Sequence, residues 1–264
     1  MNGLFSFNKQ KFLTGFTLIE ILMVISMVFL LAALILVALS DAKERARVST
    51  IINFDASIDH ALGAYKIGEW NFDSGNANNS AGNGNNMTLS NYNYNLGGIE
   101  KTGLSSTTTL ASTYARVVSP TTELDSKSGA ITLSIMEYPL SNVLLYTRIY
   151  HFYKVGSYSF YCNNCITTGA WNFTVTASGG TCPVTVASGK PLEKLKWNNI
   201  IATYDGKGTV KIYLNSKVIG SAFCAGRGAL INSVSTNPVY TGYMTSWSPL
   251  NIDEIKIYDA FLDI

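Results

Sequence analysis

The sequence predicts a long N-terminal α-helix, half transmembrane and half amphipathic, followed by an all-β antiparallel jelly-roll sandwich. Three observations predict this arrangement. Residues 16–39 form an almost uninterrupted apolar run. Residues 40–62 contain neither Gly nor Pro and keep a single apolar stripe. From residue 65 on, short alternating apolar segments are separated by turn residues.

The composition is that of a folded protein with nearly balanced charge. Of the 264 residues, 47% are hydrophobic and 14% are charged, and the formal net charge is +2. A chain of this length fits one medium domain plus an appendage better than two full domains. Because no basic stripe stands out, we expect no nucleic-acid partner.

The apolar run of residues 16–39 is long enough to cross a bilayer, which takes about 20 apolar residues. A secretory signal peptide is the alternative, since Lys9 and Lys11 form a positive segment before the run. The apolar region of such a signal is usually shorter, about 7 to 15 residues. A plain membrane anchor would leave Glu20 unexplained, because an acid within a membrane helix is costly and usually has a partner.

The segment after the run changes from lipid-like to amphipathic. Apolar residues recur there at steps of three, four, six or seven: Val48, Ile51, Ile52, Ile58, Leu62 and Tyr65. This spacing places them along one side of a helix that Gly63 would end. The stripe therefore predicts a surface against which the second half of the helix lies.

The stretch KFLTGFTLIE carries a specific N-terminal pattern. It closely resembles the type III signal of type IV pilins and pseudopilins. Five residues carry the resemblance: Lys9, Lys11, Gly15, Phe16 and Glu20. The pattern covers only about the first fifth of the chain.

The resemblance implies how the N-terminus is processed and used. Prepilin peptidase would cut between Gly15 and Phe16, which removes residues 1–15 as a leader peptide. The new amino group of Phe16 would be methylated, and the pilin-type helix would cover residues 16–64. Glu20 would neutralise the amino terminus of a neighbouring subunit during assembly, in keeping with the strong attraction of opposite charges at low dielectric.

The same resemblance implies locations and partners. The chain would lie in the inner or cytoplasmic membrane before assembly, and afterwards in an extracellular filament or at the cell surface. Its helix would pack against other pilin subunits. Many major pilins have a helix breaker in this region, so the absence of Gly and Pro between residues 16 and 62 favours a minor pilin or a pseudopilin.

A β-hairpin is the clearest feature of the later part of the chain. In NNIIATYDGKGTVKIYLNSKVIG, Asp205 and Gly206 form a turn, and Val210, Ile212 and Leu214 alternate with other residues. No second helical period of useful length follows residue 65. The pattern predicts an antiparallel sandwich or jelly roll.

This hairpin, which Trp197 opens, resembles the central hairpin of laminin G-like members of the concanavalin A-like lectin and glucanase superfamily. The segments GEWNFDSG and AGNGNNMTLSN resemble the first strand and its loop, and IDEIKIYDAFL resembles the closing strand. ITLSIMEYPL fits an intermediate strand less well. The resemblance spans residues 65–262 and implies a jelly roll over residues 65–264 that binds a glycan or a surface protein.

Many relatives hold a structural calcium near the first and last strands. Here the resemblance implies Asp73, Asn83 and Asp253 as its ligands, because Ca²⁺ takes six to eight oxygens. The pattern is thinned, with Ser74 and Asn79 at positions where acids are common. The alternative is that Asp73 and Asp253 only cap strands and turns.

The chain lacks the acid pattern of the superfamily's glycan hydrolases, which place Glu-x-Asp-x-x-Glu on one strand. The nearest clusters, EWNFD and IDEIKIYD, do not match it. Catalysis needs alternate residues, because only side chains on the same strand face can reach one bond. We therefore predict that the protein is not an enzyme.

Aromatic residues crowd one segment of the predicted sandwich. The segment YTRIYHFYKVGSYSFYC supplies Tyr146, Tyr150, Phe152, Tyr153, Tyr158, Phe160 and Tyr161. At a period of two, about half of them should belong to the core. We expect the two histidines, His60 and His151, to be surface or packing residues.

Four cysteines lie in the part of the chain expected outside the membrane. Their even number in an oxidising compartment favours disulfides. We expect one bond between Cys162 and Cys165, across a two-residue Asn-Asn turn, and a second between Cys182 and Cys224. A four-cysteine zinc site is the alternative, although two CxxC pairs would be more typical of zinc.

The sequence thus predicts a minor pilin or pseudopilin of a type IV pilus or a type II secretion-like filament, with a lectin-like adhesive domain. A structural major subunit with no specific ligand is the alternative. A membrane-tethered glycan hydrolase is a third interpretation, which the missing acid pattern disfavours.

Overall fold

The computed structural model describes residues 15–99, 101–106, 113–140, 148–186, 189–232, 237–244 and 249–263. Lys9, Lys11 and Tyr146 therefore lie outside the described residues. The chain divides into two compact units, Met1–Ser49 and Thr50–Ile264.

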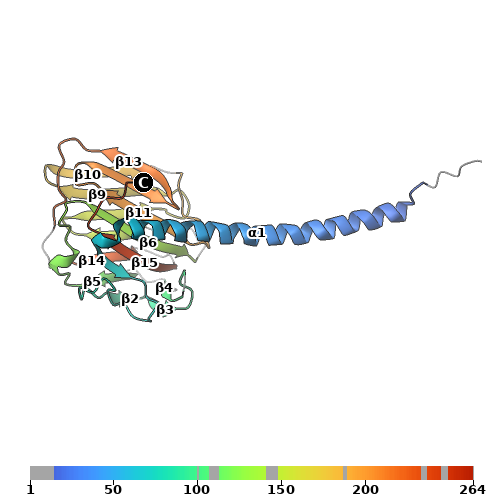
Figure 1. The fold of residues 1–264 in the computed structure, drawn as a ribbon, viewed down its shortest axis with the longest axis horizontal. Helices are drawn as coiled ribbons and strands as arrows, with labels where there is room; N and C mark the ends of the chain where they lie inside the picture. Colours follow the sequence, from blue (N-terminus) through green and yellow to red (C-terminus); the bar gives the residue numbers. More distant parts are fainter. Residues whose placement is uncertain are drawn as a thin grey trace, which may run out of the picture. The chain divides into compact units, whose positions relative to one another are not determined.

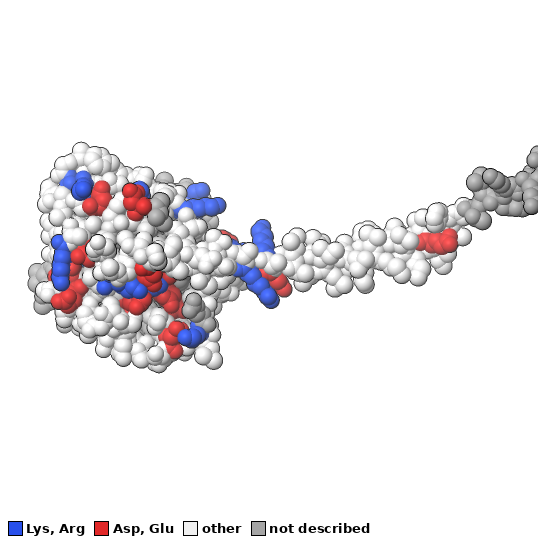
Figure 2. Space-filling model, viewed as in Figure 1, with Lys and Arg blue, Asp and Glu red and all other residues white. Residues whose placement is uncertain are grey.

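Helix α1 (Leu18–Leu62) is unbroken over its whole length, as the absence of Gly and Pro predicts. Its large apolar side chains from Leu18 to Leu39 are exposed. This part of the helix has almost no charged side chains on the face that Figure 2 shows. It is long and apolar enough to cross a membrane, a test that a signal sequence near the N-terminus also passes.

The second unit contains two antiparallel sheets, which confirms the predicted sandwich. Sheet A has the order β13 (Lys217–Phe223), β12 (Thr209–Leu214), β11 (Asn198–Tyr204), β6 (Ile131–Pro139), β15 (Leu250–Tyr258), β4 (Gly103–Ser106) and β3 (Asn93–Asn95), and β1 (Lys66–Trp70) also pairs with β15. Sheet B has the order β10 (Gly180–Val186), β9 (Ala170–Ala177), β8 (Tyr158–Asn163), β7 (Arg148–Lys154), β14 (Val239–Met244), β5 (Thr113–Val117) and β2 (Thr88–Ser90). Two short 3-10 helices, η1 (Gly63–Tyr65) and η2 (Thr122–Leu124), complete the described elements.

The main core lies between the inner faces of the two sheets. Strand β9 shows the alternation that a half-buried strand requires, because Trp171, Phe173 and Val175 are fully buried while the residues between them are half-buried. The predicted hairpin is confirmed, with Tyr204 paired to Val210 across the turn. The Asp205 carboxylate accepts hydrogen bonds from backbone N–H groups within this turn.

Strand β11 is buried on both of its faces, and the helix explains why. One face of the strand contributes Ile200 and Ala202 to the main core. The other face presents Ile201, which packs with Ile58 and Leu62 of α1. In Figure 1 the last part of α1 runs across the sheet formed by β6, β11 and β15.

The predicted apolar stripe of the helix is largely confirmed within the second unit. Ile51, Ile58 and Leu62 are buried, and Ile51 packs against Met136 of sheet A and against Trp197, which directly precedes β11. Tyr65 is the exception, since it is 56% exposed. It follows the end of the α-helix and lies in η1, where the helical spacing no longer holds.

A disulfide between Cys182 and Cys224 joins the two sheets at one edge, as expected for this pair. Cys182 lies in β10 of sheet B, and Cys224 directly follows β13 of sheet A. The bond closes a loop with a sequence separation of 42 residues. It also takes two of the four thiolates that the zinc alternative requires.

The expected bond between Cys162 and Cys165 is wrong in this structure, where both cysteines are free and buried. The Asn-Asn pair does not form the turn, because β8 continues to Asn163, which pairs with Ala170 of β9. The connection is therefore longer than two residues. Cys165 Sγ donates to the carbonyl oxygen of Cys162 at 3.1 Å.

The disulfide should contribute measurably to the stability of the sandwich. In the Cys182→Ala/Cys224→Ala variant of the full chain in detergent micelles, we expect the free energy of unfolding to fall by about 2–4 kcal/mol. Urea unfolding followed by tryptophan fluorescence measures this change. Dithiothreitol should destabilise the parent protein and leave the variant unchanged; destabilisation of the variant by reductant would show that Cys162 and Cys165 are bonded after all.

Candidate functional site

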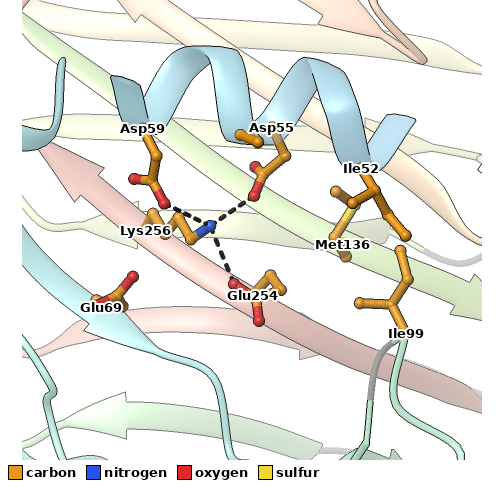
Figure 3. A pocket seen from close by; sticks show the side chains of 9 residues that line it. Ile52, Asp55, Asp59, Glu69, Ile99, Met136, Glu254 and Lys256 are labelled. Atoms are coloured by element: carbon orange, nitrogen blue, oxygen red, sulfur yellow. Dashed lines mark hydrogen bonds and ion pairs between the residues drawn. The ribbon is translucent and has the colours of Figure 1, made fainter. Parts of the chain in front are cut away.

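A buried lysine holds the helix against sheet A. Lys256 of β15 extends toward α1, and its Nζ lies 2.5 Å from Asp55 Oδ2 and 3.2 Å from Asp59 Oδ2. A third carboxylate, Glu254, lies 3.0 Å away on the same strand. Figure 3 shows the three carboxylates around the ammonium group, and charged side chains gather beside the helix on this face of the domain (Figure 2).

Burial and charge shift the titration of this cluster in opposite directions. Burial raises the pKa of the Asp55 carboxyl, although the nearby lysine partly opposes the shift. Burial alone would lower the pKa of Lys256, but the charges of Asp55 and Glu254 outweigh it and raise the pKa above its ordinary value. The lysine is therefore held in its charged form at neutral pH.

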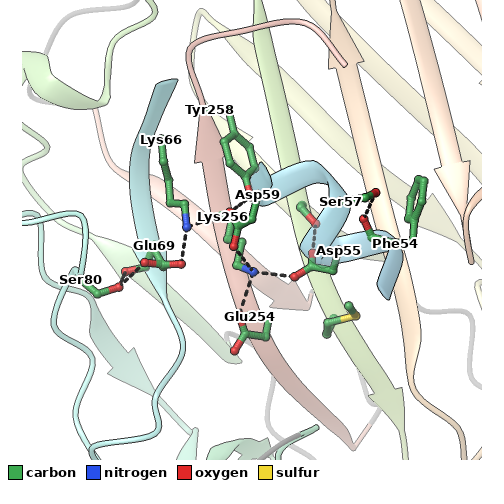
Figure 4. Close-up of polar contacts among 12 residues, drawn as sticks. Phe54, Asp55, Ser57, Asp59, Lys66, Glu69, Ser80, Glu254, Lys256 and Tyr258 are labelled. Carbon is green, nitrogen blue, oxygen red and sulfur yellow. Dashed lines mark hydrogen bonds and ion pairs between the residues drawn. The ribbon is translucent and has the colours of Figure 1, made fainter. Parts of the chain in front are cut away.

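A second lysine extends the network to the first strand of the domain. Lys66 Nζ lies 2.8 Å from Asp59 Oδ1 and 2.6 Å from Glu69 Oε1 (Figure 4). The Tyr258 hydroxyl also donates to Asp59, at 2.6 Å. Burial would raise the pKa of Asp59, but the hydrogen bonds from Lys66 and Tyr258 outweigh it and leave the pKa below its usual value.

A cavity of about 230 Å³ adjoins this cluster. It is lined by Ile52, Asp55, Ala56, Asp59, Glu69, Ile99, Met136, Glu254 and Lys256. Each of the four lining carboxylates has a lysine partner within the network. The arrangement therefore fixes the helix to the sheet, with two lysines shared among the four carboxylates.

The residues expected to bind calcium are only partly brought together. Asp73 and Asp253 are close enough that the charge of Asp73 adds to the effect of burial, which raises the pKa of Asp253 to about 7. Asp253 Oδ2 accepts from the backbone N–H of Ile99 at 2.9 Å, and Asp73 Oδ2 lies 3.6 Å from Lys101 Nζ.

The third expected calcium ligand, Asn83, serves the loop that contains it. Its amide nitrogen donates to the carbonyl of Ile67 at 2.6 Å, and its side-chain oxygen accepts from the side chains of Asn79 and Asn85. Within the described residues, no group of three or more acidic, histidine or cysteine side chains is arranged to hold a metal. These contacts do not form a common oxygen cage, and calcium binding stays a prediction.

His151 is a packing residue inside the core, whereas His60 is exposed. His151 Nδ1 lies 2.7 Å from Glu137 Oε1, and the imidazole ring stacks on Trp171 at 5.2 Å. Burial would lower the pKa of His151, but the charge of Glu137 outweighs it and raises the pKa to about 9. The side chains of His151 and Glu137 are fully buried, so a substrate cannot reach them in the folded domain.

The outer face of sheet B carries a continuous group of tyrosines, which we call the tyrosine face. Its members are Tyr114, Tyr150, Tyr153, Tyr161, Tyr240 and Tyr243. All six are half-buried, while their strand neighbours such as Ala115, Ile149 and Phe160 point into the core. Among the described aromatics of the crowded segment, Phe152, Tyr158 and Phe160 belong to the core, so the expected division into core and surface is confirmed.

Two irregularities in adjacent strands concentrate the tyrosines. In β7 the register against β8 shifts between Tyr150 and Phe152, which leaves Tyr150 and Tyr153 with ring centroids only 5.3 Å apart. In β14 the register against β5 shifts after Thr241, where Gly242 has a φ of 56°. A Cβ at Gly242 would lie 2.7 Å from the Tyr92 hydroxyl, so this position requires glycine.

The rings of the tyrosine face touch one another across four strands. Tyr150 stacks on Tyr243 with centroids 5.6 Å apart, and it also contacts Tyr161 at 5.3 Å. Tyr240 contacts Tyr114 at 5.5 Å and Tyr243 at 5.7 Å. These rings are half-buried and in mutual contact, so they form a pre-organised amphipathic surface. A ligand that binds there would cost the tyrosine side chains little entropy.

Two arginines accompany the tyrosines. The Arg148 guanidinium lies 4.5 Å from the Tyr161 ring centroid, and the Arg116 guanidinium lies 4.9 Å from that of Tyr114. Arg148 also donates to the hydroxyl of Tyr150 at 3.1 Å. These cation–π and hydrogen-bond contacts fix both guanidinium groups at the tyrosine face.

Two antiparallel sheets in a jelly-roll-like sandwich are the architecture of lectin-like domains. Residues 111–263 match the family described as the concanavalin A-like lectin/glucanases superfamily. The chain belongs to this superfamily, which confirms the second resemblance seen in the sequence.

Solved structures with a similar fold include two toxin domains. The botulinum neurotoxin type G receptor-binding domain has 14% identity and a TM-score of 0.54, over 75% of this chain and 48% of that chain. The botulinum neurotoxin serotype D ligand-binding domain, in complex with N-acetylneuraminic acid, has 12% identity and a TM-score of 0.56, over 77% of this chain and 50% of that chain. The chain thus spans about half the length of these structures, and the likeness shows the fold alone. No curated protein matches the chain by sequence.

Removal of the buried lysine should destabilise the domain in a pH-dependent way. In Lys256→Met, Asp55 and Glu254 would be buried without their counter-charge, and we expect the free energy of unfolding to fall by about 3–5 kcal/mol at neutral pH. Burial already raises the folded-state pKa values of both carboxyls in the parent, and loss of the opposing lysine would raise them further. The folded state of the variant would therefore bind more protons, and the loss would shrink as the pH falls toward 4. Thermal and urea unfolding at several pH values measure this dependence.

The exposed Lys217, replaced by Met in the same way, is the matched control and should change stability little. A Lys256→Met variant as stable as the parent at pH 8 would contradict the proposed role of the cluster. A loss of equal size at every pH would also contradict it, because the cause would then be packing and not charge.

Proposed function

We propose that this protein is a pilin-type filament subunit, a minor pilin or pseudopilin, that displays a glycan-binding domain. The tyrosine face is the observation that supports the glycan-binding part of this proposal. The N-terminal pattern from Gly15 to Glu20, followed by a helix that is able to span a membrane, supports the filament half. The disulfide between Cys182 and Cys224 fits a domain exposed outside the cell.

The chemistry of the tyrosine face suits a sugar. Sugar rings present apolar faces of C–H groups and a rim of hydroxyls, and a tyrosine offers both an apolar ring and a polar hydroxyl. Six such side chains from β5, β7, β8 and β14 form a surface long enough for several sugar units. Membership in the lectin-like superfamily and the sugar-bound state of one structural neighbour agree with this assignment.

The geometry at the start of the helix adds a local role for Glu20. Thr17 is the N-cap, and its backbone N–H and its hydroxyl both donate to Glu20 Oε2 at 2.8 Å. The backbone N–H of Glu20 donates in turn to the Thr17 hydroxyl at 3.3 Å. This is a capping box, which stabilises the first turn of a helix. In our proposal Glu20 performs this role and also pairs with the amino group of Phe16 in a neighbouring subunit.

The mature protein should begin at N-methylated Phe16, which mass spectrometry of the surface-exposed form can establish.

Glu20→Gln should insert into the membrane yet enter filaments at a small fraction of the parent level. Glutamine preserves the capping box, so the loss would come from the missing charge. Thr17→Ala, which removes the cap and keeps the charge, should assemble nearly normally. A different N-terminus, or normal assembly of Glu20→Gln, would overturn the filament proposal.

Substitution within the tyrosine face should weaken glycan binding. We expect Tyr150→Ala to reduce affinity by about tenfold, because Tyr150 contacts three other tyrosines and its loss opens the centre of the surface. Glycan-array binding of the full chain in detergent, followed by titration calorimetry, measures the effect. Tyr94→Ala, at an exposed site in sheet A, is the control. Equal binding by Tyr150→Ala and the parent protein would contradict the proposal.

A further inference from the structure

We propose that the tyrosine face selects acidic oligosaccharides, whose carboxylates bind Arg116 at one end of the face and Arg148 at the other. This inference rests on the glycan-binding function proposed above and specifies the class of ligand. The reasons are the absence of acidic residues from sheet B, the two available guanidinium groups and the distance between them.

The two sheets differ sharply in charge. None of the seven strands of sheet B contains Asp or Glu within the bounds that the structure gives them. Sheet A strands, in contrast, carry Glu69, Glu137, Asp253 and Glu254. A surface with cationic groups and no carboxylates attracts anions.

Both arginines keep hydrogen-bonding capacity for a ligand. No carboxylate among the described residues pairs with either guanidinium. Arg116 donates from Nη1 to the Tyr240 hydroxyl at 3.4 Å, and its Nε is buried, so its remaining Nη hydrogens are the ones open to a ligand. Arg148 is exposed, and among the described residues its acceptors are Asn163 Oδ1, at 2.8 Å, and the Tyr150 hydroxyl. A guanidinium has five N–H donors, so several remain on each arginine. Their fork geometry matches a carboxylate.

The strand register fixes how far apart the arginines lie. Arg116 pairs with Tyr240, and Tyr240 pairs with Tyr153 of β7. Arg148 lies five positions before Tyr153 on the same strand. At about 3.3 Å per residue, the backbone positions of the two arginines are roughly 16 Å apart along the strand direction. A single carboxylate cannot reach both.

The tyrosines fill the space between the two arginines. Tyr150 lies between Arg148 and Tyr153 on β7, and Tyr243 pairs with it on β14. A ligand that contacts both guanidinium groups must therefore cross these stacked rings. An oligosaccharide with at least two acidic sugars meets this requirement. Its sugar rings would lie on the tyrosines, while its carboxylates reach the arginines at the two ends of the tyrosine face.

Single-stranded nucleic acid also combines flat rings with negative charge. Its phosphates follow one another at every residue, however, and proteins that bind it supply a basic groove along the backbone. The tyrosine face has two separated arginines, and Lys154 of the same sheet is buried against Asp125 at 2.6 Å. The distribution of charge favours the acidic oligosaccharide.

The test compares matched ligands on the full chain in detergent micelles. The probes are oligogalacturonate of four to six units, its methyl ester of the same length, and an oligothymidylate. We expect the acid to bind at least about tenfold more tightly than the ester at low salt. Arg116→Gln and Arg148→Gln should each lose about tenfold in affinity for the acid and much less in affinity for the ester.

Lys217→Gln removes the same charge from sheet A and should leave both affinities unchanged. Equal affinities of the parent protein for acid and ester would overturn this inference and leave the glycan-binding function standing. Tighter binding of oligothymidylate than of the acid would overturn it in favour of nucleic acid. If neither sugar binds and a wider array of acidic and neutral glycans is also negative, the proposed glycan-binding function fails with it. Thermal unfolding of each variant verifies that the fold is retained.

Discussion

The packing of residues 50–62 of α1 onto sheet A is the constraint on which the rest of the domain depends. A sandwich has two outer faces, and here the helix occupies one of them through Ile58, Leu62 and the ion pairs of Lys256. Because that face is covered, the central strands β6, β11 and β15 are buried on both sides. The only large sheet surface left for recognition is therefore the outer face of sheet B, within the part of the chain that the structure describes.

Backbone irregularities, as much as composition, determine which side chains lie on the outer face of sheet B. A regular strand would place only alternate residues on the outer face. The register shifts in β7 and β14 bring Tyr153 and Tyr243 onto the same surface as Tyr150 and Tyr240. Glycine at position 242 allows this geometry, and the ring contacts then hold the tyrosines in fixed positions. Such rigidity reduces the entropy lost on binding.

Local features of the structure could be predicted from the sequence. The unbroken helix follows from the absence of Gly and Pro, and the hairpin follows from Asp205-Gly206 with its alternating flanks. The capping box could also be predicted from the sequence, since Thr17 precedes Glu20 by three positions. The wrong Cys162–Cys165 bond came from reading Asn-Asn as a tight turn, although β8 continues through the first asparagine.

Long-range features could not be predicted in this way. Lys256 and Asp55 are separated by 201 positions, and no local pattern pairs them. Tyr114 and Tyr240 belong to distant segments that meet only because β5 and β14 are neighbours in sheet B. The sequence interpretation therefore found three members of the tyrosine face and missed the other three together with both arginines. Strand order determined the site, and strand order depends on the packing of the whole sandwich.

The most direct test of the account is to locate the ligand on the protein. Full-length protein with isotope-labelled tyrosines, titrated with oligogalacturonate in detergent micelles, can be followed by NMR of the ring resonances. The account predicts shifts of Tyr150, Tyr240 and Tyr243, with Tyr94 and Tyr65 unchanged. Shifts confined to tyrosines outside the outer face of sheet B would contradict it.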